Sequence, residues 1–334
     1  MPEFTTLIQQ WYRLNKRDLP WRNVNCAYKI WISEIILQQT QVVQGLDYYD
    51  SFIKKYPTVY ALANATEQDV LHLWQGLGYY SRARNLHFTA KQIVNEFNGV
   101  FPNTYNLIIK LKGVGDYTAS AIASFAFNEP HAVVDGNVYR VLSRVFNINT
   151  PINSSKGIKA FKQLASTLLD NKKPGVHNQA LMEVGALICK PKLPLCHQCP
   201  LNHICLGFKN SNQLNFPVKI KKVNIKKRTL NYLVVTDKKD TIVIKKRDKG
   251  DIWQGLYDFP SADHYLNTSH ILLDCEIKHI LTHQHITAKF WIFTSDNYTP
   301  KNNEIKVKTS RLSDYPLPQL MIKYFKQSNH FIKD

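Results

Sequence analysis

Glu34 is the first residue of the chain whose sequence neighbours could make it a proton donor. It lies in the most apolar part of a segment from residue 28 to 56, and its helical neighbours three and four residues away are Ile30, Trp31, Leu37 and Gln38. A carboxyl group on such a face lies either at a solvated edge or in a pocket. In a pocket, desolvation raises its pKa, so that the group keeps a proton to donate. The sequence leaves both interpretations open.

A second carboxylate, Asp135, follows the apolar run AVV and precedes a predicted helix over residues 137–145. Asp is a favoured N-cap, so a purely structural interpretation is available. Upstream, Gly113 and Gly115 stand in the motif LKGVG before an Ala/Ser-rich helical pattern. Glycine permits a sharp turn between helices, and the N–H groups of the turn and of the helix start can converge on one phosphate oxygen.

Four cysteines crowd into one short, loop-rich segment. Cys189, Cys196, Cys199 and Cys205 are separated by six, two and five residues, while the other two cysteines of the chain stand alone. Four thiolates at these separations suit the wide ligand set of a [4Fe–4S] cluster. Structural zinc sites commonly use the two-residue spacing twice, so zinc is the chemical alternative. Disulfides fit poorly with the reduced compartment that we expect for this chain.

Two further stretches carry side chains suited to nucleic acid. Gln38 and Gln39 open the polar run QQTQ, which we expect to continue the helix, and their amides could hydrogen-bond to base edges. The stretch WQGLGYYSRAR combines glycines with Tyr79 and Arg82, which would place phosphate contacts beside stackable rings. The structural alternatives are the polar end of a helix for the glutamines and core packing for the apolar members of the second stretch.

The composition favours a polyanionic partner. Among 334 residues, 43 Lys and Arg face 25 Asp and Glu, which gives a formal net charge of +18. Such an excess suits nucleic acid or an anionic membrane surface, although an AT-biased genome would also enrich lysine. No apolar run has the length that crosses a bilayer, and the first residues lack the apolar core of a signal peptide. We therefore expect no membrane association and a reduced, cytoplasmic location.

The periodicity indicates an all-α part followed by an α+β part. Helices are predicted over residues 5–13, 28–56, 66–73, 81–96, 104–110, 154–170 and 177–188. The segment 207–228 is rich in Lys and has no acidic residue, which predicts a basic linker. Strands are predicted at 232–236 and 241–245, resembling a hairpin, and at 290–294, with a closing helix at 319–327. The expected domains are 1–206, 207–228 as linker, and 229–334.

Taken together, the motifs resemble adenine DNA glycosylases of the MutY type, within the helix-hairpin-helix superfamily that includes endonuclease III. The matching stretches run nearly end to end: LPWR, SEIILQQTQV, WQGLGYYSRARNL, LKGVGDYTASAIASFAF, VDGNVYRVLSR, NQALMEVGALIC, the four-cysteine array and WQGLYDFP. The resemblance implies a multidomain protein. Its parts are an all-α helix-hairpin-helix domain with a [4Fe–4S] loop and an α+β, Nudix-like C-terminal domain.

By motif position, the resemblance makes Glu34 the acid/base and Asp135 the second carboxylate of a reaction that excises adenine mispaired with 8-oxoguanine. The chemistry agrees, since breaking a glycosidic bond needs one carboxyl group to protonate the leaving base and one carboxylate to stabilise a cation-like sugar. Tyr117 stands where bifunctional relatives carry a catalytic lysine, so strand cleavage is not expected. Tyr117, Asn137 and Arg22 are expected to support the carboxylates and the adenine.

The resemblance also assigns contacts to DNA. The hairpin residues Lys112, Gly113 and Gly115 are expected at a phosphate, and Lys112 stands where the family usually has Pro. Gln38 and Tyr79 are expected to enter the base stack near the displaced adenine, and Gln39 and Arg82 are expected to contact the DNA as well. The partner is duplex DNA that carries adenine opposite 8-oxoguanine or guanine, and the protein is expected to act as a monomer associated with the nucleoid.

The C-terminal domain is expected to recognise 8-oxoguanine. The family's loop usually reads Phe-Ser-His, and the matching residues are Leu281, Thr282 and His283, so the hydroxyl and the imidazole are kept and the aromatic ring is lost. The Glu-rich Nudix box is absent, so pyrophosphatase activity is not expected. Two alternatives remain: an endonuclease-III-like pyrimidine glycosylase and lyase, and a non-catalytic iron–sulfur protein that only binds DNA.

Overall fold

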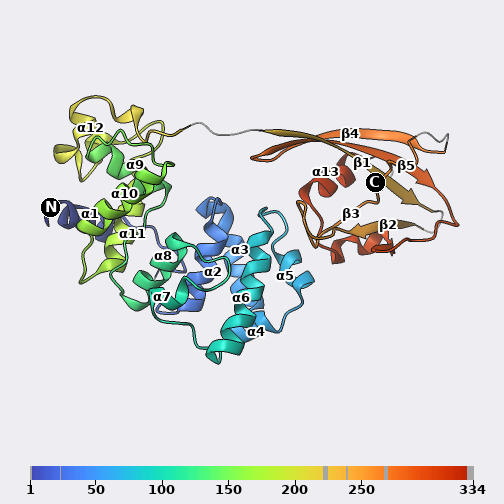
Figure 1. Cartoon of the computed structure of the whole chain (residues 1–334), viewed down its shortest axis with the longest axis horizontal. Coiled ribbons are helices and arrows are strands. Elements are labelled where there is room, and N and C mark those ends of the chain that lie inside the picture. The colour runs from blue at the N-terminus through green and yellow to red at the C-terminus, as the bar shows by residue number, and fades with distance from the viewer. Residues whose placement is uncertain (1, 23, 221–224, 238–239, 267–269, 329–334) are drawn as a thin grey trace. The chain divides into compact units, whose positions relative to one another are not determined.

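The computed structural model describes residues 2–22, 24–220, 225–237, 240–266 and 270–328. The chain forms two compact units (Figure 1). The first consists of Met1–Ala63 and Phe88–Lys221, and the second of Asn64–His87 and Lys222–Asp334. The domain boundaries expected from the sequence stay a prediction. In the described part of the chain, no helix combines the length and the apolar character needed to span a membrane.

The first unit is helical wherever it is described. Its helices are α1 (Pro2–Asn15), α2 (Ala27–Leu37), α3 (Val42–Lys55), α4 (Val59–Ala63), α7 (Tyr105–Ile108), α8 (Asp116–Phe127), α9 (Gly136–Val145), α10 (Ser155–Leu168), α11 (Pro174–Leu187) and α12 (Leu206–Lys209). Single 3-10 turns lie at Cys196–Gln198, Asn202–Ile204 and Gln213–Asn215. The helix α6 (Ser81–Phe97) begins in the second unit and ends in the first. The expectation of an all-α part up to residue 205 is confirmed for the described residues.

Apolar stripes of α1, α9, α10 and α11 build the core that supports one side of this unit. Its buried members include Ile8, Val141, Phe161 and Leu181, each almost fully excluded from solvent. Burying side chains of this size contributes about 1.5–3 kcal/mol each. Gly185 permits a close helix approach, because a Cβ at this position would lie 2.6 Å from the Cβ of Asn137. The start of α9 is therefore pressed against α11.

The predicted helix over residues 28–56 is wrong in one respect, because it is broken into α2 and α3. Helix α2 ends at Leu37, and Gln39 adopts the left-handed conformation with φ of 56°. The residues of α2 before the break are almost all buried, whereas Gln39 is exposed. Four polar residues in a row cannot continue a buried helix without losing their water, so the chain turns there.

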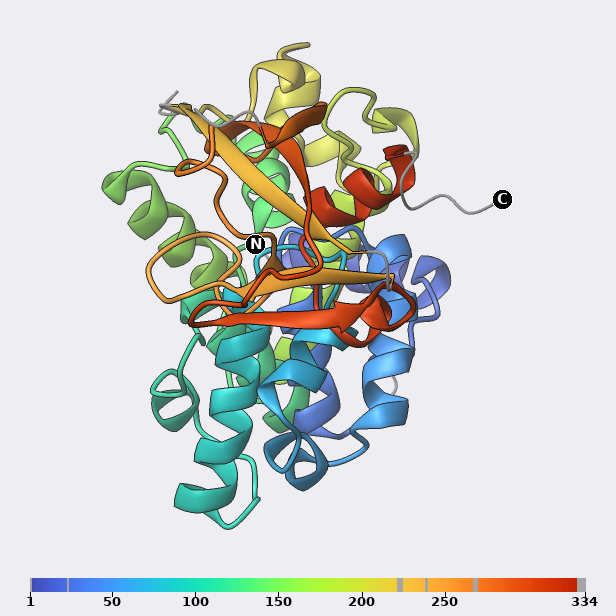
Figure 2. The ribbon, with the colours of Figure 1, turned by 90° about the vertical axis from the view of Figure 1, so that its right-hand side faces the viewer.

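The second unit joins the helical segment α5 (Glu67–Leu73) and the start of α6 to a mixed sheet with a closing helix. The strands are β1 (Lys226–Thr236), β2 (Thr241–Lys246), β3 (Tyr257–Asp258), β4 (Leu272–Ile280), β5 (Gln284–Thr294) and β6 (Glu304–Lys308), and the closing helix is α13 (Gln319–Gln327). The order is β3-β2-β1-β5-β4, with β6 paired to β2. These strands run from gold to red in Figures 1 and 2.

The sheet pairs differently from the hairpin that the sequence predicts. Strands β1 and β2 are antiparallel neighbours whose described residues register at Thr236 and Ile242, whereas β1 runs parallel to β5 along its whole length. Strand β1 begins at Lys226, inside the predicted basic linker. Helix α13 matches its predicted bounds and packs Tyr324 against Phe290 of β5, with ring centroids 4.0 Å apart. This arrangement holds the β4–β5 turn at one end of a firmly packed sheet.

Candidate active site

Glu34 lies in a pocket and not at a solvated edge. The carboxyl group is buried in α2, and the hydroxyl group of Tyr117 donates a hydrogen bond of 2.8 Å to its Oε2. The pKa of Glu34 is raised to about 7. Burial is the main cause and the nearby charge of Asp135 adds to it, while Tyr117 and Arg22 act in the opposite direction. A carboxyl group with this pKa is protonated in a large fraction of molecules near neutral pH and can donate a proton.

Asp135 is the N-cap of α9 and carries more hydrogen bonds than Glu34. Its Oδ1 accepts from the backbone N–H of Val138 at 2.8 Å, and its Oδ2 accepts from Nδ2 of Asn137 at 2.7 Å. Burial raises the pKa of Asp135 above its ordinary value, while these two donors oppose the rise. The donors favour its ionised form, whereas the ionised form of Glu34 is favoured by one hydrogen bond from Tyr117 and by the charge of Arg22.

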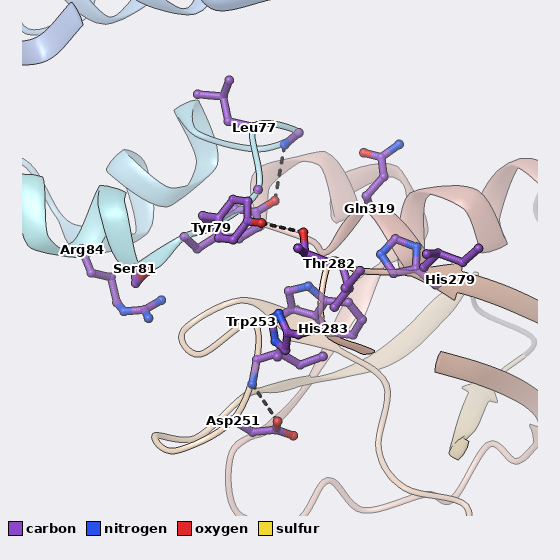
Figure 3. A pocket seen from close by; sticks show the side chains of 16 residues that line it. Leu77, Tyr79, Ser81, Arg84, Asp251, Trp253, His279, Thr282, His283 and Gln319 are labelled. Carbon is purple, nitrogen blue, oxygen red and sulfur yellow. Dashed lines mark hydrogen bonds between the residues drawn. The ribbon is translucent and has the colours of Figure 1, made fainter. Parts of the chain in front are cut away.

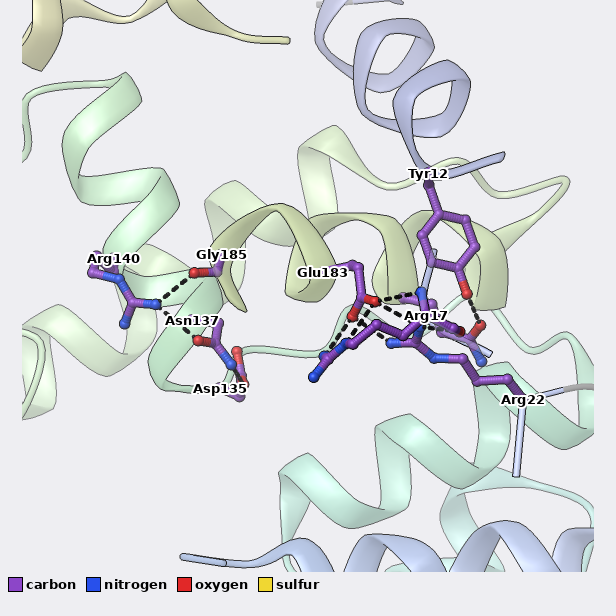
Figure 4. Close-up of polar contacts among 9 residues, drawn as sticks. Tyr12, Arg17, Arg22, Asp135, Asn137, Arg140, Glu183 and Gly185 are labelled. Carbon is purple, nitrogen blue, oxygen red and sulfur yellow. Dashed lines mark hydrogen bonds and ion pairs between the residues drawn. The ribbon is translucent and has the colours of Figure 1, made fainter. Parts of the chain in front are cut away.

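A line of hydrogen bonds continues from Asp135 through Asn137 to Arg140 (Figure 4), and Arg140 also reaches the cysteine segment. Asn137 Oδ1 accepts from the guanidinium group of Arg140 at 2.8 Å, and the same group donates to the carbonyl oxygens of Gly185 at 2.7 Å and Cys189 at 2.6 Å. The orientation of Asn137, and through it of Asp135, is thus fixed by α11 and by the first cysteine.

Arg22 lies in a buried ion cluster that the sequence did not reveal. Its guanidinium group donates to both oxygens of Glu183, at 2.8 and 2.5 Å, and Arg17 binds the same carboxylate at 2.9 and 2.7 Å (Figure 4). Burial by itself would raise the pKa of Glu183, but the hydrogen bonds from the two arginines lower it to about 2. Glu183 was missed because its partners lie far away in the sequence. Its only local signal is a carboxylate inside the apolar helix α11.

The hairpin before α8 has the open backbone that a phosphate contact requires. Gly113 has φ of 78°, and a Cβ added to Gly115 would meet no atom within 4 Å. Lys112 is exposed, with Nζ 4.1 Å from the centre of the Phe88 ring. The two glutamines behave differently: Gln38 donates to Oγ1 of the buried Thr118 at 3.2 Å, whereas Gln39 is exposed at the tip of the turn.

The four cysteines of the array surround one cavity. Cys189, Cys196, Cys199 and Cys205 all line it, and none of them forms a disulfide. Among the described residues, no three His, Cys, Asp or Glu side chains are arranged to hold a single metal ion. Arg144, which is buried, donates to Sγ of Cys189 at 3.3 Å. Burial raises the pKa of the Cys199 thiol to about 12, so this thiol would ionise only with a cation beside it.

Within the second unit, Tyr79 and the β4–β5 turn share a cavity of about 450 Å³ (Figure 3). Leu281, Thr282 and His283 form the turn, and Oγ1 of Thr282 lies 2.7 Å from the hydroxyl oxygen of Tyr79. Tyr79 has φ of 48° and is 42% exposed. Trp253 and His279 also line the cavity, with ring centroids 5.7 Å apart.

Arg82 does not face solvent as a phosphate contact would. It is buried, and its guanidinium group donates to the carbonyl oxygens of Leu77 at 3.3 Å and Gly78 at 3.1 Å. The same group lies over the Trp74 ring, 5.1 Å from its centre. Arg82 therefore shapes the loop that presents Tyr79.

The predicted site residues thus gather in two places. The first unit holds the two carboxylates with Tyr117, Asn137 and Arg22, and it also holds the hairpin, the glutamines and the cysteines. The second unit holds Tyr79, Arg82 and the β4–β5 turn.

Known families match both parts of the chain. The family described as HhH-GPD superfamily base excision DNA repair protein matches residues 32–166, and the NUDIX domain matches residues 231–327. Among solved structures, a thermostable thymine-DNA glycosylase shares 31% identity, with a TM-score of 0.58 over 62% of this chain and 95% of that one. An endonuclease III–DNA complex, at 21% identity and a TM-score of 0.54 over 63% of this chain and 97% of that one, shares the fold.

Similar curated proteins agree with one another. The adenine DNA glycosylase of Buchnera aphidicola (strain Bp) is 40% identical over 261 residues, which are 77% of this chain and 73% of that protein. The human adenine DNA glycosylase is 45% identical over 211 residues, which are 60% of this chain and 39% of that protein. The chain therefore belongs to the adenine DNA glycosylases, base excision repair enzymes that hydrolyse the N-glycosyl bond of adenine.

Proposed function

We propose that this enzyme removes adenine paired with 8-oxoguanine, or with guanine, from duplex DNA without cleaving the strand. The observation that carries the proposal is the buried Glu34, whose pKa is raised to about 7 beside Tyr117 and Asp135. One carboxyl group that holds a proton and a second that is stabilised as an anion are the pair that glycosidic hydrolysis requires.

The reaction follows from the two protonation states. Glu34 gives its proton to N7 of adenine, and the bond between N9 and C1′ breaks with its electron pair passing to the base. Asp135 stabilises the positive charge that develops on the sugar, or bonds to C1′ briefly. Glu34, now a carboxylate, takes a proton from a water molecule whose oxygen bonds to C1′. The enzyme ends as it began, with adenine and an abasic site as products.

The presence of Tyr117 instead of an amine is the reason why we propose hydrolysis without lyase activity. The phenol of Tyr117 is partly buried and donates to Glu34, and the loss of water around it raises its pKa well above the ordinary value. A neutral phenol cannot form the Schiff base through which an amine opens the sugar and cleaves the strand. Trapping of a protein–DNA adduct by borohydride would instead support the endonuclease-III-like alternative.

We propose that Gln39, in place of the Gln38 that the sequence indicated, enters the duplex beside the target, and that Gln38 supports the turn through its hydrogen bond to Thr118. Gln39 is exposed in a left-handed turn, whereas Gln38 is engaged with Thr118. Lys112 and the N–H groups near Gly113 and Gly115 bind a backbone phosphate. The partner is duplex DNA, which the protein contacts as a monomer in the cytoplasm at the nucleoid.

The cysteine array suits a [4Fe–4S] cluster. Four thiols line one cavity, and a buried guanidinium group donates to Sγ of Cys189, which would offset thiolate charge. A bound cluster would tie the loop of residues 189–205 together. About four irons per chain and a visible absorbance band are expected. Cys199→Ser should lose iron, whereas Cys275→Ser, at a cysteine outside the array, should keep it; zinc in an anaerobically purified, colourless protein would contradict the assignment.

We propose that the cavity of the second unit reads the base opposite adenine. Thr282 and His283 supply a hydroxyl group and an imidazole, and Tyr79 supplies a ring that can stack on a base. The side chain of Leu281 cannot stack as an aromatic ring would. Discrimination between 8-oxoguanine and guanine then rests on the hydroxyl groups of Tyr79 and Thr282.

The deciding experiment is single-turnover release of adenine from three duplexes, with adenine opposite 8-oxoguanine, guanine or thymine. Release from the first two only would support the proposal, and Glu34→Gln should abolish it while binding is kept. Equal release from all three would contradict the partner specificity. Tight binding without release from any duplex would favour the non-catalytic alternative, provided that the iron content is full.

A further inference from the structure

Lys162 of α10 binds three groups that belong to two other segments. Its Nζ lies 2.9 Å from Oδ2 and 3.2 Å from Oδ1 of Asp116, 3.0 Å from Oγ of Ser120 and 2.7 Å from the carbonyl oxygen of Ala132. Asp116 and Ser120 belong to the first turns of α8, whereas Ala132 lies in the extended stretch before α9. One ammonium group thus joins two segments that the chain does not place side by side.

Each of these segments carries a residue of the proposed reaction. Tyr117, which donates to Glu34, follows Asp116 directly in α8. Asp135 comes three residues after Ala132. A shift of α8 against the stretch before α9 would therefore move Tyr117 and Asp135 relative to each other.

A second side chain also holds the stretch before α9 by hydrogen bonds. Asn178 of α11 is buried, and its Oδ1 accepts from the backbone N–H of Val133 at 3.1 Å. Its Nδ2 donates to the carbonyl oxygen of His131 at 2.8 Å and to Oγ of Ser124 at 3.0 Å. With Asn178 on one side and Lys162 on the other, three consecutive residues have backbone groups bound by side chains from two different helices.

A simpler role for Lys162 would be a contact to a DNA phosphate, since it lies near the start of α8. An ammonium group has three N–H donors and no acceptor. Asp116, Ser120 and Ala132 already take one donor each. A phosphate could be bound only if one of these contacts were given up, so the geometry favours an internal role.

We infer that Lys162 is a positioning residue for the proposed glycosidic hydrolysis: it fixes the start of α8 against the stretch that leads to Asp135. The inference rests on the proposed function. Geometry of this kind matters because misplacing a reacting group by about 1 Å can cost about a hundredfold in rate. The carboxylate of Asp116 serves as the main anchor, and it also accepts from the hydroxyl group of Tyr105 at 2.8 Å.

The test separates the rate of the chemical step from binding. Adenine release is measured under single-turnover conditions for the wild type and for Lys162→Met, Lys162→Arg and Lys159→Met. Lys159 is an exposed lysine of the same helix, so its variant controls for the lost charge. Affinity is measured on the same duplex with fluorine at C2′ of the target nucleotide, which resists cleavage because it destabilises the sugar cation.

Lys162→Met should lower the release rate about tenfold or more, while Kd changes by less than about twofold. Lys162→Arg, which keeps several donors, should recover most of the rate, and Lys159→Met should match the wild type. The double variant Asp116→Asn/Lys162→Met should stay slow, because the bond to Ala132 is still missing. Thermal unfolding of each variant shows whether the fold is intact at the assay temperature.

Three results would overturn the inference. The first is a Lys162→Met rate equal to that of the wild type. The second is a raised Kd of Lys162→Met for the duplex at an unchanged release rate, together with a smaller salt dependence of this binding. That result would make Lys162 a phosphate contact. The third is a defect that the double variant abolishes, since Lys162 would then only mask the charge of Asp116. A wild-type chain that releases no adenine would count against the proposed function itself.

Discussion

The hydroxyl group of Tyr117 lies 2.8 Å from Oε2 of Glu34; Glu34 is buried and Tyr117 is partly buried. An ionised Glu34 can only accept, so the phenol donates to it, and this hydrogen bond is stronger to the carboxylate than to the neutral acid and favours the carboxylate. Burial and the charge of Asp135 act in the opposite direction and prevail, which leaves the pKa of Glu34 at about 7. Tyr117 therefore restrains a pKa that would otherwise rise further, and it keeps the acid able to release its proton.

Tyr117→Phe should move the alkaline limb of the pH–rate profile to higher pH. Glu34 acts as the acid only while protonated, so the rate falls as pH rises through its pKa. Without the phenol, that pKa lies higher and the fall comes later. The measurement is single-turnover release between pH 5 and 9. Tyr60→Phe, whose hydroxyl group donates to the carbonyl oxygen of Asn98, is the control and should leave the profile unchanged.

Glu34→Gln should make the folded protein more stable at alkaline pH while it abolishes activity. The folded-state pKa of about 7 lies above the ordinary value of 4.5, so the native chain binds an extra proton between these values. Stability therefore falls as pH rises across this window. Removing the acid should raise the free energy of unfolding by up to about 3 kcal/mol at pH 8 and leave it unchanged at pH 4. Equal stability of both proteins at pH 8 would contradict the raised pKa.

Glu183→Gln should be strongly destabilising, because it leaves Arg17 and Arg22 beside a neutral amide. Breaking a buried ion pair from one side costs about 3–5 kcal/mol. The folded-state pKa of about 2 lies below the ordinary 4.5, so this stabilisation is complete above pH 4.5 and is lost as pH falls toward 2. The difference between variant and wild type should shrink in the same window. Glu3→Gln, which removes the exposed pair with His203, should change the free energy of unfolding by less than about 1 kcal/mol.

Gly185→Ala should displace Asp135, although the two residues are not neighbours in the sequence. The added Cβ would lie 2.6 Å from the Cβ of Asn137 and 3.0 Å from its carbonyl oxygen, so α9 must move away from α11. Overpacking of this kind costs about 1–3 kcal/mol, and adenine release should slow as Asn137 and Asp135 shift together. Gly136→Ala is the control for stability without DNA, because its Cβ would meet nothing within 4 Å. Equal unfolding temperatures for the two variants would contradict the close approach.

These residues also show what the sequence could and could not reveal. Glu34 and Asp135 stood out because their signals are local: a carboxylate in an apolar helix and a cap before the next helix. Glu183 carries the same local signal, but its meaning depends on Arg17 and Arg22, more than 160 residues earlier. The parallel pairing of β1 with β5 is likewise a long-range choice that no hairpin rule predicts. The direction of a side chain is likewise absent from the sequence. The expectation of Gln38 in the base stack therefore took no account of its hydrogen bond to Thr118, and Arg82 was expected at a phosphate although it is buried.

Thr282→Val should narrow the preference for 8-oxoguanine over guanine as the partner base. Oγ1 of Thr282 lies 2.7 Å from the hydroxyl oxygen of Tyr79, so in the free protein the two groups satisfy each other. When a base arrives, the same hydroxyl groups can donate to or accept from its edge, and an apolar side chain cannot. Losing one such bond is worth about 1 kcal/mol, so the ratio of release rates should fall about fivefold. Thr282→Ser keeps the hydroxyl group and should keep the ratio. If Val and Ser variants discriminate equally well, the preference comes from the neighbouring imidazole of His283 or from the backbone of the turn.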